Sequence, residues 1–332
     1  MATDGDVLDA DDFDRAAARI GPLVEHTPLR ECVALSDRLR ARVLVKAENL
    51  QHAGSFKIRG VLNALLTWRE QGDLPVGIAT FSAGNHAAAV AYATAQLGIP
   101  AVVCMPPKAV ASKVDAVRRY GGEIVFTADL VGACAEVIAE RGYRLLHPFD
   151  DRTVIAGHGT VGLEMLADGP VPDLVLVPVG GGGLISGVAA AVKTRSPGTR
   201  VVGVEPLGAN AMSHALRRGA PDPLPQHPHS IADGLTAPFA GRHTLAHVKA
   251  FVDDVIEIDE QPIVDAWWPL MEATKLLLEP SAVVGLAAIL AGAVSYDEGS
   301  TIVLVLSGGN TSPENLRRLT PDPNPPDPPA RS

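Results

Sequence analysis

The chain has 332 residues, of which 47% are apolar, and its 28 basic and 38 acidic residues give a formal net charge of −10. This length favours two domains, or one domain carrying a large insertion. The acidic balance, without a Lys/Arg-rich stretch, argues against nucleic acid and anionic membranes as partners. The longest apolar run, 282–294, is shorter than the roughly 20 residues of a membrane span, so it predicts a buried helix.

The three cysteines, Cys32, Cys104 and Cys134, are odd in number and widely spaced. No CxxC pair is present, which argues against a disulfide framework and against a zinc ribbon. The N-terminus is acidic and lacks the apolar segment of a signal peptide. We therefore expect a protein of the reducing cytoplasm.

Apolar runs typical of strands alternate with Ala-rich stretches typical of helices. Strands are predicted at 43–47, 77–80, 101–104, 123–126, 143–146, 174–179, 201–204, 252–258 and 301–306, and helices at 58–68, 86–97, 112–120, 133–141, 159–166, 184–194 and 261–275. Such alternation predicts an α/β fold of mostly parallel sheets flanked by helices.

Four strand–helix units crowd into residues 76–147, which predicts a compact domain inserted into a larger one. We expect a large domain made of 1–72 and 149–319, a small domain at 73–148, and a cleft between them. The end of the chain, 320–332, is rich in proline and predicts a disordered tail.

A run of four glycines, Gly180 to Gly183, separates a strand from a helix. A glycine turn lets backbone N–H groups approach an anion, and the helix N-terminus adds the positive end of its dipole. The run matches neither G-x-G-x-x-G nor a P-loop, although Glu205 closes a strand about 20 residues later, where a ribose-binding acid would lie. A phosphate cradle, a nucleotide site and a ligand-free turn all remain open from this segment.

Three other segments place polar groups at the ends of elements. Lys57 lies in GSFKIRG at a helix start, where the helix dipole disfavours a cation and so favours a neutral, nucleophilic amine; a solvated surface lysine is the alternative. The segment SAGNH, 82–86, could bind a carboxylate or simply cap a helix. Ser307 ends a strand in SGGN, either facing a ligand or only preceding a turn.

In chain order, the motifs GSFKIRG, SAGNHA, HPFDD, IAGHGT, VPVGGGGL, GVEP, IADG, EPSA and SGGN lie within residues 54–310, and the resemblance they carry runs from about Thr27 to Asn310. Together they resemble the fold-type II pyridoxal-phosphate enzymes, and most closely the threonine/serine dehydratase and serine racemase branch. The resemblance implies a two-domain fold like that of the tryptophan synthase β chain, pyridoxal 5′-phosphate as cofactor, and a homodimer.

The resemblance also implies residue roles. Lys57 would form the Schiff base, Phe56 would lie against the cofactor ring, Asn85 would bind the ring hydroxyl, and Ser307 would meet the pyridine nitrogen. The phosphate would be held by backbone N–H groups of Gly180, Gly181, Gly182, Gly183 and Leu184. We expect the substrate site to contain Ser82, Ala83, Asn85, His86 and His158.

The implied reaction removes water and then ammonia from a small L-β-hydroxy amino acid, L-threonine or L-serine. A serine hydroxyl cannot keep the pyridine nitrogen protonated as a carboxylate could, so the ring is a weaker electron sink. Prompt loss of a β-leaving group suits such a ring better than transamination does. The freed Lys57 amine would remove the α-proton as general base.

The chain departs from the branch at three positions. Racemases resemble S-S-G-N-H, whose second serine acts on the opposite face, whereas this chain has Ala83, which favours a dehydratase. The divalent-cation site of the family resembles a Glu with a carboxylate six residues on; Glu205 is followed there by Ala211, so Glu205 is only a weak metal candidate. The usual G-Q-G-T contains His158, which either alters substrate choice and pH profile or is a satisfied histidine.

Other functions stay open. One alternative is a β-replacement synthase, but its asparagine loop more often resembles S-G-N-T/S, so SAGNHA argues against it. A dehydratase for hydroxyaspartate or a bulkier β-hydroxy acid, a serine racemase, and, from another class, a nucleotide-binding sensor are the remaining alternatives. His243 and His247 do not form HExxH, because the residue after His243 is Thr244.

Overall fold

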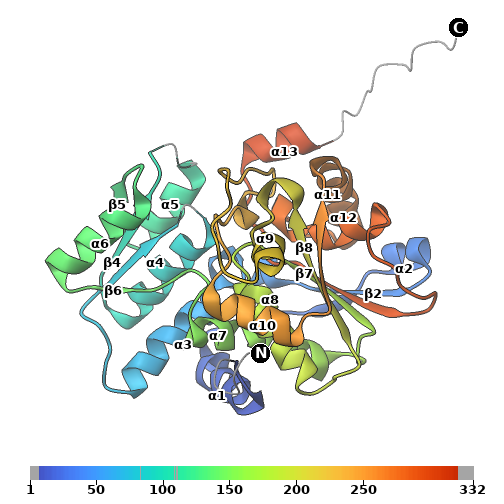
Figure 1. The fold of residues 1–332 in the computed structure, drawn as a ribbon, viewed down its shortest axis with the longest axis horizontal. Helices are drawn as coiled ribbons and strands as arrows, with labels where there is room; N and C mark the ends of the chain where they lie inside the picture. Colours follow the sequence, from blue (N-terminus) through green and yellow to red (C-terminus); the bar gives the residue numbers. More distant parts are fainter. Residues whose placement is uncertain (1–6, 83, 108, 110, 321–332) are drawn as a thin grey trace, which may run out of the picture.

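The computed structural model describes residues 7–82, 84–107, 109 and 111–320, in which two sheets flanked by helices lie side by side (Figure 1). The larger sheet has the order β1-β2-β10-β7-β8-β9 and the smaller one β5-β4-β3-β6. Every strand pair is parallel except β1 with β2. The predicted α/β fold with mostly parallel sheets is confirmed.

The larger sheet consists of β1 (Leu29–Glu31), β2 (Arg42–Lys46), β7 (Leu174–Pro178), β8 (Arg200–Pro206), β9 (Asp254–Ile258) and β10 (Thr301–Val305). The smaller sheet consists of β3 (Ile78–Phe81), β4 (Ala101–Met105), β5 (Glu123–Phe126) and β6 (Arg144–Leu145). All nine predicted strands are present. The antiparallel edge strand β1 is additional, and its short, mostly exposed sequence carries no apolar run that could have revealed it.

The helices are α1 (Ala10–Ile20), α2 (Val33–Leu39), α3 (Lys57–Glu70), α4 (Asn85–Leu97), α5 (Ala111–Arg119), α6 (Leu130–Arg141), α7 (Arg152–Asp168), α8 (Gly183–Lys193), α9 (Ala211–Arg218), α10 (Arg242–Phe251), α11 (Glu260–Thr274), α12 (Val284–Leu290) and α13 (Pro313–Leu319). The seven predicted helices and the buried helix expected in 282–294 are present. Helix α7 begins well before residue 159, because Asp151 caps it by accepting from the N–H groups of Thr153 and Val154.

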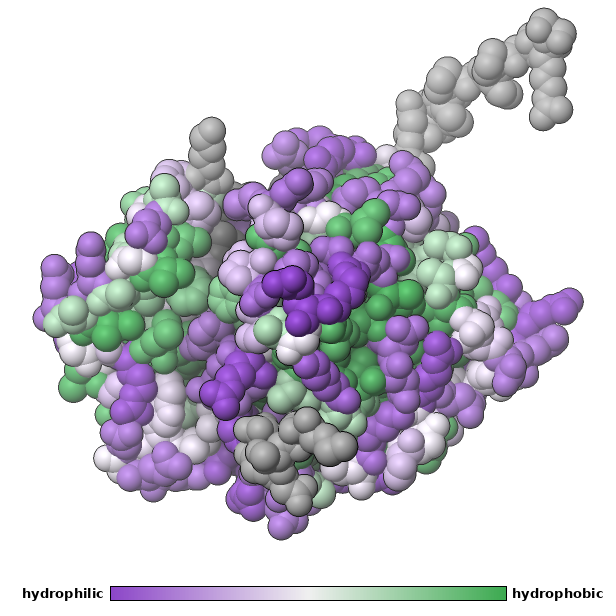
Figure 2. Space-filling view, viewed as in Figure 1, coloured by the Kyte–Doolittle hydropathy of each residue, from purple (hydrophilic) through white to green (hydrophobic). Residues whose placement is uncertain are grey.

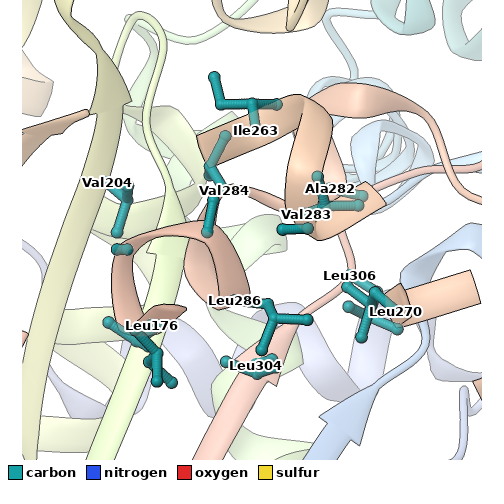
Figure 3. Packing of buried hydrophobic residues seen from close by; sticks show 14 of the residues in the cluster. Leu176, Val204, Ile263, Leu270, Ala282, Val283, Val284, Leu286, Leu304 and Leu306 are labelled. Atoms are coloured by element: carbon teal, nitrogen blue, oxygen red, sulfur yellow. The ribbon is translucent and has the colours of Figure 1, made fainter. Parts of the chain in front are cut away.

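Both faces of the larger sheet are covered. On one face, Leu176 and Leu304 of neighbouring strands pack against Leu286 of α12, together with residues of α11 (Figure 3). On the other face, Val175 and Val303 belong to a separate cluster that includes α8. Because successive strand residues point to opposite faces, a sheet covered on both sides needs apolar residues at every position, as the uniformly apolar runs predicted.

We call the four-stranded sheet with α4, α5 and α6 the small unit, and the rest of the described chain the large unit. The four strands of the small unit lie within 78–145. The domain boundaries predicted at 73 and 148 are consistent with that arrangement, and we keep them as a proposal. Residues 321–332 of the expected tail lie outside the described part of the chain.

On the face drawn in Figure 2, polar and apolar side chains are interspersed over both units. The exposed large apolar residues, such as Leu23, Val76 and Val171, are scattered along the sequence. Among the described residues, no helix is both long and apolar enough to cross a membrane. Cys32, Cys104 and Cys134 are buried and free of disulfides.

A buried ionic network fixes the first turn of α3. The Arg59 guanidinium is fully buried and donates to Glu48, at 2.8 Å from Nε to Oε2, and to Glu164, at 2.6 Å from Nη1 to Oε1. Burial alone would lower the pKa of Arg59, but the two carboxylates raise it, so the charge is retained. Lys46, also fully buried, pairs with Glu164 at 2.6 Å. The network joins α3 to α7 and to the end of β2.

We predict that Arg59→Met destabilises the fold by about 3–5 kcal/mol, because it leaves Glu48 without its buried cationic partner. Urea unfolding measures the free energy. The control is Arg217→Met, which breaks an ion pair of the same 2.6 Å length whose arginine side chain is 57% exposed, and it should cost less than about 1 kcal/mol. Equal losses in the two variants would contradict the role assigned to the network.

Candidate active site

Lys57 is the first residue of α3, and its amine points back into the protein. Nζ donates to the backbone oxygen of Pro148 at 2.7 Å and lies 5.2 Å from the centre of the Phe56 ring. Burial lowers the pKa of Lys57 to about 8, while the negative charge of Glu279 raises it in part. The low pKa expected from sequence is therefore present, but its main cause is desolvation rather than the helix dipole.

The glycine run links the end of β7, at Pro178, to the start of α8, at Gly183. Its conformation requires glycine at particular positions. A side chain at Gly181 would bring its Cβ within 2.5 Å of the Phe149 ring, and Gly182 has a left-handed φ of +93° with Met212 packed closely against it. The run thus places glycine N–H groups at a helix N-terminus, which suits a phosphate.

Ser307 follows β10, the strand next to β7, so it lies at the same edge of the sheet as the glycine run. Its hydroxyl is buried and has no hydrogen-bond partner. Its backbone oxygen accepts from the N–H of Phe56 at 3.2 Å, and Ser55 pairs with Gly308, which brings Lys57 and Ser307 together. The buried Ser55 hydroxyl is likewise unpartnered. Buried polar groups are nearly always satisfied, so these hydroxyls point to a missing ligand.

Asn85 and Ser82 belong to the loop between β3 and α4 in the small unit. Asn85 begins α4, and its amide is held by residues of the large unit, with Nδ2 donating to Glu279 at 2.8 and 3.0 Å and Oδ1 accepting from Asn310 at 2.9 Å. The Ser82 hydroxyl accepts from the N–H of Gly84 at 3.1 Å and so shapes the loop. Ala83 lies outside the described residues.

His86 is buried within the small unit. Its Nε2 lies 3.1 Å from Thr80 Oγ1 and 3.1 Å from the Leu146 carbonyl oxygen. Because a carbonyl can only accept, Nε2 carries the proton, and burial followed by the charge of Lys57 holds the pKa of His86 well below its usual range. The neutral ring anchors the loop to the sheet and leaves Nδ1 without a partner.

His158 is fully buried between helices and was expected in the substrate site. Its ring packs edge-on against Phe56, with centres 4.8 Å apart, and a side chain at Gly60 would meet its Nε2 at 2.5 Å. Burial, and then the charge of Lys57, keeps the pKa of His158 well below its usual range. The ring supports Phe56, and neither of its buried nitrogens has a described partner that meets hydrogen-bond geometry, so the expected contact with substrate stays a prediction.

The Glu205 carboxylate is bound by backbone N–H groups of its own chain. It accepts from the N–H groups of Met212 and Ser213, at 3.1 and 2.8 Å, near the start of α9. Burial raises the pKa of Glu205 to about 7. Over the described residues, no group of three or more His, Cys, Asp or Glu side chains is arranged to hold a metal ion.

Sequence reasoning quoted two of the central residues, Glu279 and Asn310, within motifs but gave them no role. Glu279 is only 5% exposed and lies between Asn85 and Gly308, where a side chain on Gly308 would meet its Oε1 at 2.7 Å. An acid within the apolar segment LLLEPSAVVGLAAIL was the available signal. A buried carboxylate normally requires a partner, and here the partner is the Asn85 amide.

Taken together, these residues fit a pyridoxal 5′-phosphate site. The glycine run offers N–H groups to the phosphate, Ser307 presents an unpartnered hydroxyl at the same sheet edge, and Lys57 presents an amine that is partly neutral near pH 8. Asn85 brings an amide from the small unit to the same place.

The comparisons with known proteins agree with that fit. Residues 20–308 match the family "Pyridoxal-phosphate dependent enzyme". Serine racemase of Oryza sativa subsp. indica is 40% identical over 315 residues, covering 92% of each chain. L-threonine ammonia-lyase of Geobacter sulfurreducens is 40% identical over 296 residues, covering 88% of this chain and 73% of the relative. The structure of maize serine racemase superposes with a TM-score of 0.88 at 39% identity, covering 94% and 96% of the two chains.

The chain therefore belongs to the pyridoxal-phosphate-dependent enzymes of fold type II. Within that class it is a member of the threonine dehydratase/serine racemase family. The family, the fold and the cofactor predicted from sequence are confirmed.

We predict that, in the protein freed of cofactor, Lys57 reacts with acetic anhydride with a midpoint near pH 8, read by mass spectrometry of the peptide that carries it. In the denatured chain the midpoint should return to about 10.5, the ordinary value. Between these two values the folded chain binds fewer protons at this site, so Lys57 opposes folding less as the pH rises. A folded-state midpoint near 10.5 would show that the amine faces water.

Proposed function

We propose that the protein converts L-threonine or L-serine to a 2-keto acid and ammonia by α,β-elimination. The observation that carries the choice is Ala83, because a methyl side chain has no proton to exchange, wherever it lies. Racemisation needs proton transfer on both faces of the substrate α-carbon. Lys57 can act on one face, and Ala83 offers nothing in the position where racemases of the branch resemble serine.

Residues of both units would hold the cofactor. The N–H groups of 180–184 would bind the phosphate, Ser307 the pyridine nitrogen and Asn85 the ring hydroxyl, with Phe56 beside the ring. Bound pyridoxal phosphate would withdraw electrons from the substrate α-carbon and so ease loss of its proton. The unpartnered Ser307 hydroxyl and the glycine run support these roles.

The reaction then depends on the charge of Lys57. With a pKa of about 8, a useful fraction of the amine is neutral near physiological pH and can take the α-proton as general base. Polar groups of 82–86, at the N-terminus of α4, would hold the substrate carboxylate. Loss of the α-proton and the β-hydroxyl removes one water; the released enamine becomes an imine, which takes up one water to give keto acid and ammonia.

Hydroxyaspartate and bulkier β-hydroxy acids remain alternatives. Serine racemase is the second candidate, favoured by the 40% identity to the rice enzyme.

We also propose that the protein works as a homodimer in the cytoplasm. Three buried, unbridged cysteines suit a reducing compartment, and the homodimer rests on the resemblance to the dehydratase branch. Size-exclusion chromatography with light scattering is expected to give about twice the 34.6 kDa chain mass. A mass equal to one chain would contradict the dimer.

A keto-acid assay with L-threonine, L-serine, their D-forms, 3-hydroxyaspartate and phenylserine tests the function. We expect L-threonine and L-serine to react fastest. Lys57→Ala should lose turnover by about 10²–10⁴-fold together with the visible colour of the bound cofactor.

The matched variant Ala83→Ser tests the choice between elimination and racemisation. It restores a proton-bearing side chain and should raise D-serine formation from L-serine by up to about 10²-fold, measured by chiral chromatography. The unaltered protein should form pyruvate with little D-serine. D-serine formation at a rate similar to that of pyruvate in the unaltered protein would favour serine racemase instead.

A further inference from the structure

Glu279 is a buried acid that the reaction described above does not use. It lies just before the short helix η6 (Pro280–Ala282), and its N–H donates to the Gly308 oxygen at 3.2 Å. That bond places the carboxylate beside the segment that follows Ser307. An acid in this position carries a desolvation cost, so its contacts and its charge need an explanation.

The contacts of Glu279 cross the junction between the two units. Both carboxylate oxygens accept from Asn85 Nδ2, at 2.8 and 3.0 Å, while Asn85 Oδ1 accepts from Asn310 Nδ2 at 2.9 Å. Asn310 is itself fixed, because its Nδ2 also donates to the Ala53 oxygen at 2.8 Å. The Asn85 amide is thus held on both its nitrogen and its oxygen by the large unit, and it has one orientation.

The charge of Glu279 acts on Lys57. Its negative charge raises the pKa of the lysine against the larger lowering by burial. The other titratable groups around Lys57 are His86, His147 and His158, and burial lowers the pKa of each, so they are mainly neutral near pH 8. Glu279 is therefore the acidic group that balances the lysine.

Several neighbouring groups act on the charge state of Glu279. Burial raises its pKa to about 7, the Asn85 amide lowers it, and the nearby charge of Asp233 raises it. Lys113 and Lys57 lower it further, and Lys113 is itself paired with Asp233. The two charges favour each other, because the Lys57 ammonium lowers the pKa of Glu279 and the Glu279 carboxylate raises that of Lys57.

We propose that Glu279 is a positioning residue, which orients the Asn85 amide across the junction of the two units and supplies the negative charge that balances Lys57. It stabilises the ammonium form of Lys57 through charge and acts on the cofactor ring hydroxyl through Asn85. The inference deepens the proposed function and rests on it for the roles of Lys57 and Asn85.

The charge is tested in cofactor-free protein by the acetic anhydride labelling of Lys57. Glu279→Gln keeps the size of the side chain and removes its charge, so the labelling midpoint should fall by about one pH unit, a tenfold change in the protonation ratio. Glu205→Gln is the matched control, because Glu205 is also a buried acid with a pKa near 7 but is held by Met212 and Ser213. It should leave the midpoint unchanged. An unchanged midpoint in Glu279→Gln, or an equal shift in both variants, overturns the charge role.

The orientation of Asn85 is tested by titrating cofactor-free protein with pyridoxal 5′-phosphate. Glu279→Asp keeps the charge but shortens the side chain, so it should raise the dissociation constant several-fold and leave the Lys57 midpoint near that of the unaltered protein. Asn85→Ala should raise the constant similarly, and the double variant should add little, because one residue acts through the other. Fully additive losses overturn the positioning role. Glu279→Asp carries the positioning test even if Glu279→Gln does not fold.

Neither measurement contains an amino-acid substrate, so the two proposals can fail separately. If no keto acid forms but labelling and cofactor binding behave as expected, only the proposed substrate is wrong. If keto acid forms normally and the Lys57 midpoint does not move in Glu279→Gln, only the role of Glu279 is wrong. Circular dichroism checks that each variant is folded.

Discussion

The site depends on one buried amine opposite one buried carboxylate. Removing Lys57 from water makes its proton easy to lose, and Glu279 limits that effect so that both charge states are accessible near neutral pH. The amine can be buried at the start of α3 because Arg59, two residues further on, ties the same turn to Glu48 and Glu164. The ion pairs of Arg59 thus stabilise a turn in which the burial of Lys57 is unfavourable.

Strand order brings the remaining groups to this amine. The glycine run follows β7 and Ser307 follows β10, and these strands are hydrogen-bonded neighbours although more than a hundred residues separate them in sequence. The carboxyl ends of parallel strands share one edge, which is where such sheets bind ligands. The small unit adds Asn85 from the loop after β3, at the corresponding end of its own sheet.

Much of this was predictable because local signals carried it. Uniformly apolar runs marked the doubly covered strands, and the motifs around Lys57, Asn85, 180–184 and Ser307 lie together as their resemblance implied. Glu279 received no role, because its partner Asn85 is 194 residues away and only the folded chain shows the pair.

Helices α1, α2, α9, α10 and α13 were not predicted from the sequence. Helix α1 was missed although Phe13, Ala16 and Ile20 follow helical spacing and Asp9 caps it. The acidic start of the chain was used only to argue against a signal peptide.

Close crossing of glycine-rich helices buries His158: a side chain at Gly157 would collide with the backbone of Arg59, and one at Gly187 with that of Ile155. Its expected place in the substrate site stays a prediction.

The way in which the small unit is attached has a mechanical consequence. The chain enters it after α3 and leaves it before α7, and residues of α3 such as Leu62 and Leu65 share a single apolar cluster with Ile78 and Leu146 of the small unit. Wide hinge opening would expose that shared cluster to water, whereas sliding of packed helices by small amounts would not. The architecture therefore favours a shear motion of low amplitude when ligands enter and leave. In that motion the small unit would slide over the apolar cluster that it shares with α3.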